Sequence, residues 1–364
     1  MTALRPAAFA TAALAVLTLS ACATAADDDA AATSNATSDA AATSAPATTA
    51  DAEADGSFTL YAGRDQELID PLIEQFEADT GISVEVRYAG STELAALLLE
   101  EGEASPADVF LSQDAGALGA VAKADMFATL PETVSETVPA GFTSTDGSWV
   151  GVTGRARVIV YDGEQLSAEE VPTTVAALTG EQWSSQVGIA PTNASFQSFV
   201  TALRVLEGED AAREWLEGMS SNDVQIYAKN TPILEAANAG EIQLGLINHY
   251  YWYRMAAEIG TDNMRAQLAF PEPGDAGGIV NVTGAGLLNA ASEDADALEF
   301  VEYLVSEPAQ QYFVDNTYEY PLIDGVSAPE GLPALDTLTN PELDLSDLDS
   351  LGETTDLLVE VGLL

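Results

Sequence analysis

The chain has 364 residues, which is too long for one small core and suits two lobes of ordinary domain size. Its 59 acidic residues against 11 basic ones give a formal net charge of −48. Such a surface repels nucleic acid and anionic lipid, so nucleic-acid binding is excluded. The acidity fits adaptation to a saline or otherwise demanding outside environment, or a general attraction for cations, and it does not locate a site.

Residues 1–22 have the pattern of a secretory signal. Arg5 precedes an apolar run through Leu19, and small residues lead to Cys22 in "LSAC". This pattern resembles the lipobox of bacterial lipoproteins, which implies a lipid on Cys22 and attachment to the outer face of the cell membrane. The alternative, a short membrane anchor, needs roughly 18 or more apolar residues. Cys22 is the only cysteine, so an internal disulfide and thiol–metal chemistry are excluded.

Residues 23–55 are expected to form a disordered tether. They are Ala, Thr, Ser and Asp with almost nothing to bury, and such a composition cannot offset the entropy of the chain.

The next part alternates between strand and helix patterns. Strands are predicted at 57–63, 82–90 and 107–114, with helices at 66–81 and 91–102, the second capped by Ser91. One face of the first helix carries only apolar residues, namely Leu68, Ile69, Leu72, Ile73 and Phe76. This β-α-β-α-β order predicts a parallel sheet with helices on both faces.

Residues 148–162 are predicted to form two strand-like runs interrupted by Gly154, and the alternation then resumes. Three further strand patterns are each followed by a helix pattern. The pairs are 185–191 with 196–208, 222–230 with 231–240, and 242–248 with 249–260. A mixed region at 278–289 precedes helical patterns at 292–315 and a loop-rich, acidic end.

We therefore expect an α/β protein with two lobes of mixed sheet and a cleft between them. The chain crosses between the lobes near residue 155 and returns near residue 280. The expected parts are 56–155 for lobe 1, 156–280 for lobe 2, 281–331 for the return to lobe 1, and 332–364 for a C-terminal segment on lobe 2.

Three predicted strand-to-helix turns in the second lobe carry an asparagine: Asn193, Asn230 and Asn248. Asparagine is a good helix cap, which is one explanation. The other is that these turns lie at the sheet edge where ligands bind, because helix N-termini there suit an anion. Three such turns in one lobe favour binding. Arg155 and Arg157 would either complete an anion pocket or form an interlobe salt bridge.

Tyr250 and Tyr251 are adjacent at the start of a predicted helix, in "INHYYWYR". Neighbours in a first helical turn are about a third of a turn apart, so both oxygens can reach one point above the sheet edge. A phenol has a pKa of about 10 and binds a metal only when the cation strongly favours loss of the proton. A hard trivalent cation such as Fe(III) suits phenolate oxygen. Packing, or stacking on an organic ligand, is the alternative from these residues alone.

From about Phe58 to the end, the chain resembles the bacterial ferric-iron-binding proteins that serve ABC transporters, which have the bilobal, transferrin-like periplasmic-binding fold. Eight collinear stretches carry the resemblance: "LYAGRDQEL", "FEADTGISVEV", "PADVFLSQD", "WVGVTGRARVIVYD", "APTNASF", "YAKN", "GEIQLGLINHYYW" and "YEYPL". The resemblance implies that Tyr250 and Tyr251 supply two phenolates to Fe(III). It also implies a site for a synergistic anion, phosphate or carbonate, formed by Asn193, Ala194, Ser195, Asn230, Asn248 and Arg155.

The resemblance places the metal candidates of the first lobe at Asp65 and Gln113, where some members of the family have a histidine and a glutamate. Asp65 keeps a carboxylate, whereas Gln113 is neutral, with Asp114 beside it. The tyrosine that other members carry in the stretch "PTNASF" is absent. His249 adjoins the tyrosines in sequence, but that position need not face the metal.

The sequence thus predicts a monomeric solute-binding lipoprotein, and not an enzyme, that closes around Fe(III) and an anion and delivers them to an ABC permease. The alternative on the same fold is a binding protein for an organic phosphate, phosphonate or sugar phosphate, which has no need of two adjacent phenolates. A hydrolase has little support, because G-x-S-x-G and H-E-x-x-H are absent and a single histidine leaves no triad.

Overall fold

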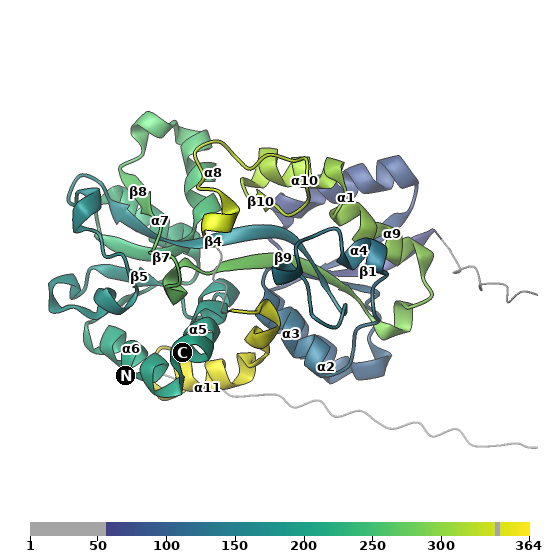
Figure 1. Cartoon of the computed structure of the whole chain (residues 1–364), viewed down its shortest axis with the longest axis horizontal. Helices are drawn as coiled ribbons and strands as arrows, with labels where there is room; N and C mark the ends of the chain where they lie inside the picture. The colour runs from purple at the N-terminus through teal and green to yellow at the C-terminus, as the bar shows by residue number, and fades with distance from the viewer. Residues whose placement is uncertain (1–55, 339–342) are drawn as a thin grey trace, which may run out of the picture. The chain divides into compact units, whose positions relative to one another are not determined.

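The computed structural model describes residues 56–338 and 343–364 (Figure 1). The predicted signal, the lipidation site Cys22 and the tether therefore lie outside the described residues. Within the described ranges no helix has both the length and the apolar character needed to cross a membrane.

Three parallel strands begin the first lobe, as the β-α-β-α-β pattern predicts. β1 pairs with β2 on one side and with β3 on the other. The elements are β1 (Ser57–Ala62), α1 (Gln66–Thr80), β2 (Ser83–Tyr88), α2 (Ser91–Glu101), β3 (Val109–Ser112) and α3 (Ala115–Lys123). In Figure 1 the helices α2 and α3 lie below these strands, and α1 lies above them. The carboxyl ends of the three strands therefore meet at one edge of the sheet.

The rest of the first-lobe sheet is antiparallel and comes from distant parts of the chain. β9 (Val280–Leu287) pairs antiparallel with β3 and β4, and β10 (Tyr320–Pro321) pairs antiparallel with β4. The helices α9 (Ala295–Leu304) and α10 (Glu307–Tyr312) follow β9, and the short helix α4 (Glu132–Ser135) precedes β4. The sheet is thus mixed, and its purely parallel part is limited to the first three strands.

The second lobe repeats the strand–helix alternation. Its parallel strands are β5 (Val187–Ile189), β6 (Gln225–Ile226) and β7 (Leu244–Asn248), and β8 (Ala266–Ala269) pairs antiparallel with β4. Its helices are α5 (Ala194–Glu207), α6 (Glu209–Ser221), α7 (Asn230–Ala239) and α8 (His249–Ile259). The sequence predictions above do not include α6, although its buried residues Ala212, Trp215, Leu216 and Met219 recur at helical spacing on one face.

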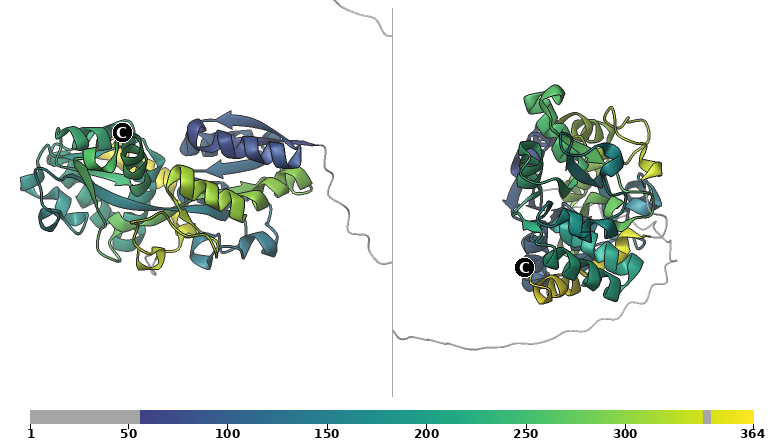
Figure 2. Two further views of the ribbon diagram at one scale, coloured as in Figure 1. Left: turned by 90° about the horizontal axis from the view of Figure 1, so that it is seen from above. Right: turned by 90° about the vertical axis from the view of Figure 1, so that its left-hand side faces the viewer.

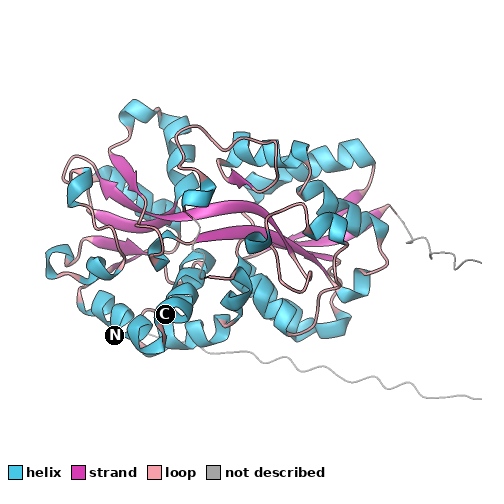
Figure 3. Cartoon of the chain, viewed as in Figure 1, coloured by secondary structure: helices cyan, strands magenta, loops and turns pink. Residues whose placement is uncertain are grey.

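One long strand joins the two sheets. Residues 148–162 do not form two strand-like runs, because β4 (Val150–Asp162) is continuous and buried along its whole length. Its first part, through Ala156, pairs with β9, and its last part, from Arg157, pairs with β7. Gly154 does not interrupt the strand, because it pairs with Val282 of β9 and Tyr320 of β10. Glycine fits this position because a side chain here would press against Tyr320 and Leu322. Figure 3 shows β4 and β9 running together through the middle of the described part.

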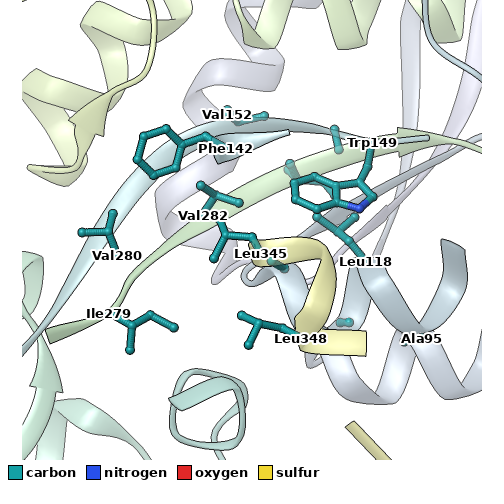
Figure 4. Close-up of a cluster of buried hydrophobic side chains, with 14 of the residues drawn as sticks. Ala95, Leu118, Phe142, Trp149, Val152, Ile279, Val280, Val282, Leu345 and Leu348 are labelled. Carbon is teal, nitrogen blue, oxygen red and sulfur yellow. The ribbon is translucent and has the colours of Figure 1, made fainter. Parts of the chain in front are cut away.

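The core beneath β4 and β9 is closed by the C-terminal residues. Leu345 and Leu348 are buried with Leu118 of α3, Trp149 and Val282 (Figure 4). The following helix, α11 (Leu351–Glu360), packs on both α3 and α5. The hydroxyl of Thr354 lies 2.7 Å from that of Thr201 on α5, and both side chains are buried. Figure 2 shows the ribbon of the described part from two further directions.

Candidate metal and anion site

The two tyrosines lie at the first turn of α8, directly after β7. Tyr250 is fully buried and Tyr251 is 7% exposed, and their rings stack with centroids 4.2 Å apart. The side-chain amide of Gln113, from the first lobe, donates a hydrogen bond of 3.2 Å to the hydroxyl of Tyr250. The next two aromatic residues have packing roles: the indole of Trp252 donates to the carbonyl of Ala266, and Tyr253 packs against Trp252.

Two arginines and a glutamate surround the phenols in the protein interior. Arg64 forms a bidentate ion pair with Glu319, at 2.9 and 3.1 Å, and Arg155 lies 3.9 Å from the same carboxylate. Burial raises the pKa of Tyr250 well above its usual value, and the neighbouring Tyr251 adds to this, while Arg64 and Arg155 oppose it. Tyr250 is therefore a neutral phenol until a cation arrives that can displace its proton.

The anion-site residues of α5 and α7 form one polar cluster. Asn193 caps α5 by accepting a hydrogen bond of 3.0 Å from the backbone N–H of Ser195, and it also accepts from the Ser195 hydroxyl at 2.7 Å. The amide of Asn230 donates to the Ser195 hydroxyl at 3.1 Å. The side-chain oxygen of Asn230 is buried and has no hydrogen-bond partner within residues 56–338 and 343–364. Ala194 lies beside them and lines the cleft.

Capping explains only one of the three asparagines. Asn230 is the first residue of α7, whose cap is Lys229, and Asn248 precedes α8 without a side-chain capping bond. Ser91 likewise begins α2 and does not cap it, because its hydroxyl donates to the carbonyl of Gly63. Asn248 pairs with Arg157 in the β4–β7 ladder, which brings the third turn next to the anion cluster.

The two arginines of β4 have different surroundings, although both are buried. Arg155 donates to the carbonyl of Val282 and lies near Glu319, so its ionic contact is within the first lobe and is not the interlobe salt bridge that was one expectation. Arg157 forms no ion pair with an acidic group in the described part of the chain. Its guanidinium donates to the carbonyl of Ser195 at 3.2 Å and lies over the ring of Phe199. Burial lowers the pKa of Arg157 to about 9, with Tyr251 acting in the opposite direction. Arg157 is therefore a buried cation next to the cap of α5 whose charge no acidic side chain of the described residues balances.

Both ring nitrogens of His249 contact backbone groups. His249 is fully buried, its Nδ1 accepts from the N–H of Ala156 at 3.1 Å, and its Nε2 lies 2.9 Å from the carbonyl of Tyr318. Burial lowers the pKa of His249 to about 4, so the ring is neutral. Because both ring nitrogens already have partners, neither is available to a metal.

The first-lobe candidates face the tyrosines across a cleft. A cavity of about 760 Å³ is lined by Asp65 and Gln113 from one side and by Asn193 and Tyr251 from the other. Asp65 is half-exposed and lies 3.6 Å from Lys229, the residue that precedes α7. Asp114 does not reach this cavity, because it caps α3 and accepts a hydrogen bond of 2.8 Å from Ser198 of α5.

The residues at this cleft suit a hard cation bound through oxygen. Among the described residues, no group of three or more His, Cys, Asp and Glu side chains is arranged to hold a metal. A ligand set here therefore depends on the phenols, on Asp65 or Gln113, and on an anion. Arg64 and Glu319 were not predicted as site residues, although both occur in stretches that carry the family resemblance, "LYAGRDQEL" and "YEYPL". In the sequence, Arg64 stands out as a basic residue in an acid-rich chain, and Glu319 stands out as a glutamate between two tyrosines.

Residues 104–344 match the family of bacterial extracellular solute-binding proteins. The major ferric iron-binding protein of Neisseria meningitidis serogroup B is 34% identical over 317 residues, which cover 86% of this chain and 96% of that protein. The chain belongs to the bacterial ferric-iron-binding proteins of this family.

Solved structures agree with the predicted bilobal fold of this solute-binding protein. Iron-bound HitA from Pseudomonas aeruginosa has a TM-score of 0.79 and 31% identity, covering 84% of this chain and 99% of HitA. A Trichodesmium protein solved with iron and citrate ligands has a TM-score of 0.72 and 28% identity, over 85% of this chain and 100% of its own. These relatives are solute-binding proteins, and their bilobal periplasmic-binding fold is also the fold of this chain.

Proposed function

We propose that this chain is an extracytoplasmic solute-binding protein whose cargo is Fe(III) together with a synergistic anion. Tyr250 and Tyr251 supply two phenolates, and phosphate or carbonate binds at the turn of Asn193 to Ser195, next to Asn230. One observation carries the proposal: a buried, stacked pair of phenols at a helix start, beside a polar cluster backed by an unpaired cation.

The buried phenols favour a highly charged cargo. Burial holds the pKa of Tyr250 well above its usual value, so a weakly polarising cation does not displace the proton. A trivalent cation supplies the electrostatic energy for the loss of this proton, and Arg64 and Arg155 lower the cost at Tyr250. The names of the relatives, which are ferric iron-binding proteins, support the same cargo.

Closure of the two lobes would complete the site. Side-chain contacts already join them, among them Gln113 with Tyr250, Thr92 with Gln197, Asp114 with Ser198, and Asp65 with Lys229. A cargo that is bound by both lobes adds contacts that only the closed state can make, and it therefore shifts the population toward that state.

The remaining parts of the proposal concern delivery. The lipobox-like signal supports a lipid anchor on Cys22 at the outer face of the membrane, with residues 23–55 as the tether. Membership of the solute-binding family supports an ABC permease as the partner, to which the monomeric protein presents its cargo.

A colour change tests the proposal directly. Fe(III) bound to phenolate has a visible charge-transfer band, so the wild-type protein loaded with ferric citrate should turn orange to red. The double variant Tyr250→Phe, Tyr251→Phe should stay colourless, because it retains the rings and loses both ligating oxygens. Tyr253→Phe, on the same helix but packed against Trp252, is the matched control and should keep the full band. Thermal melting of each variant shows that the fold is retained.

The opposite result would identify a different cargo. A colourless wild-type protein that binds a sugar phosphate in a calorimetric titration would overturn the iron proposal in favour of the organic-phosphate alternative. The polar cluster of Asn193, Ser195 and Asn230 would then be the main site.

A further inference from the structure

The second lobe offers two phenols, whereas the two carboxylates that the first lobe presents to the 760 Å³ cavity, those of Asp65 and Glu93, both belong to exposed residues. Gln113 is neutral, and the carboxylate of Asp65 is half-exposed and lies 3.6 Å from the ammonium of Lys229. A ferric ion held by two phenolates and one anion retains coordination positions that face the first lobe. Another oxygen ligand on that side of the cleft can fill these positions.

Tyr88 is placed at the correct edge of the first-lobe sheet. It is the last residue of β2, and in the parallel ladder it pairs with Ala62, three residues before Asp65. Because β1, β2 and β3 are parallel, the carboxyl end of β2 lies at the same edge as Asp65 and Gln113. The side chain of Tyr88 is half-buried and lines the same 760 Å³ cavity as Tyr251.

The other tyrosines of the described first lobe do not line this cavity, and two of them donate hydrogen bonds elsewhere. The hydroxyl of Tyr61 donates to Glu101, and the hydroxyl of Tyr312 donates to the backbone carbonyl of Leu68. Tyr88 and Tyr251 are the two tyrosines whose side chains line the cavity, and they come from opposite lobes.

A carboxylate of α1 holds the hydroxyl of Tyr88. The phenol donates a short hydrogen bond to Oδ1 of Asp70, whose Oδ2 accepts a bond of 2.7 Å from the side chain of Gln66. Asp70 lines an adjoining cavity that shares Asp65 and Tyr251 with the first one. Burial and the contact with Asp70 raise the pKa of Tyr88, so the empty protein keeps this phenol neutral, as it does Tyr250.

We propose that Tyr88 is the first-lobe protein ligand of the cargo, a third phenolate that binds Fe(III) when the lobes close. This inference rests on the proposed iron function. On ligation the O–H bond of Tyr88 breaks, the oxygen keeps the electron pair and bonds to the ferric ion, and the proton passes to Asp70 and then to water. No oxidation or reduction takes place. The ferric ion then bridges Tyr88 of the first lobe and the two phenolates of the second lobe. Closure of the lobes therefore depends on the bound iron.

The test compares Tyr88→Phe with wild type and with Tyr312→Phe, using Fe(III) supplied as its nitrilotriacetate complex at fixed pH. Each phenol that becomes a ligand releases one proton and adds to the charge-transfer band. Tyr88→Phe should therefore release about one proton fewer per bound iron and lose roughly a third of the band intensity. Tyr312→Phe should match wild type in both measurements, because it removes a first-lobe phenol that does not line the cavity.

The outcomes separate this inference from the iron proposal. A wild-type protein without a visible band overturns both. A coloured wild type with a Tyr88→Phe variant of equal band intensity and equal proton release overturns the role of Tyr88 alone. Equal band and proton release combined with weaker binding of ferric citrate would show that Tyr88 contacts the chelator, and this result also overturns the ligand assignment. Each substitution removes only one hydroxyl group, so the variants should keep the fold. Circular dichroism of each variant checks this.

Discussion

Removing the charge of Glu319 should destabilise the protein more than any surface substitution. Glu319 is fully buried and accepts hydrogen bonds from Arg64 at 2.9 and 3.1 Å, from Thr153 at 3.0 Å and from Thr317 at 3.1 Å, with Arg155 at 3.9 Å. Glu319→Gln keeps the shape and one carbonyl oxygen but leaves two guanidinium groups in the interior without a carboxylate. Breaking a buried ion pair in this way costs about 3–5 kcal/mol.

The magnitude converts into a measurable shift of the melting temperature. For a folded part of roughly 300 residues, the entropy of unfolding makes this loss equal to about 5–8 °C in Tm. Urea unfolding followed by circular dichroism gives the free energy directly, since the midpoint should fall while the slope stays constant. Glu299→Gln, on the exposed side of α9, is the control and should change the free energy of unfolding by less than about 0.5 kcal/mol.

The pH dependence provides a second check of the same reasoning. Burial alone would raise the pKa of Glu319, but Arg64 and Arg155 outweigh burial and hold this pKa below its usual value of 4.5. The stabilisation is therefore fully present above pH 4.5 and is lost as the pH falls through the lower folded-state pKa. The difference between wild type and Glu319→Gln should shrink in that acidic range. A variant with wild-type stability at pH 7 would refute the account of a buried, charge-balanced network.

Two further predictions concern the site and its support. The pKa of His249 falls from 6.5 in the unfolded chain to about 4 in the fold, so the unfolded state binds more protons between these values and stability declines as the pH falls through this window. Between pH 7 and pH 5 the wild type should lose about 2 kcal/mol that His249→Gln does not lose, as measured by denaturant titrations at both pH values. An equal loss in both proteins would contradict a neutral, buried ring. Arg157→Gln should weaken phosphate binding to the iron-loaded protein by about tenfold to a hundredfold, because it removes a charged donor at Ser195. Arg155→Gln should weaken phosphate binding less, since the charge of Arg155 is balanced by the nearby Glu319. A calorimetric titration in which Arg155→Gln weakens phosphate binding more than Arg157→Gln would instead assign the anion site to Arg155.

Part of the site was predictable because its signals are local. The position of Tyr250 and Tyr251 at a strand-to-helix turn follows from the pattern of residues 242–260, and the structure has β7 and α8 at this place. The asparagine turns were predictable for the same reason, and the structure brings Asn193, Asn230 and Ser195 into one hydrogen-bonded cluster. Such turns can be predicted because the spacing of apolar residues changes from the strand period to the helix period within a few residues.

Other features depend on contacts that periodicity cannot reveal. Two arginines of one strand, Arg155 and Arg157, look equivalent in sequence, yet only Arg155 has a carboxylate nearby. The strand run at 148–162 appeared broken at Gly154, whereas in the fold Tyr320 and Leu322 pack against that glycine and the strand continues. In both cases the deciding partner comes from β10 and the residues beside it, far along the chain.

The sequence by itself determined the α/β class, the two-lobe order and the tyrosine pair, because these follow from short-range patterns of apolar residues and turns. The tertiary structure decided which charges are balanced and which side chains share the cleft. Arg64 and Glu319 are 255 positions apart, and Gln113 and Tyr250 are 137 apart. Such residues come together because β4 pairs with β9 in the first sheet and with β7 in the second, and burial then shifts the pKa of the titratable ones.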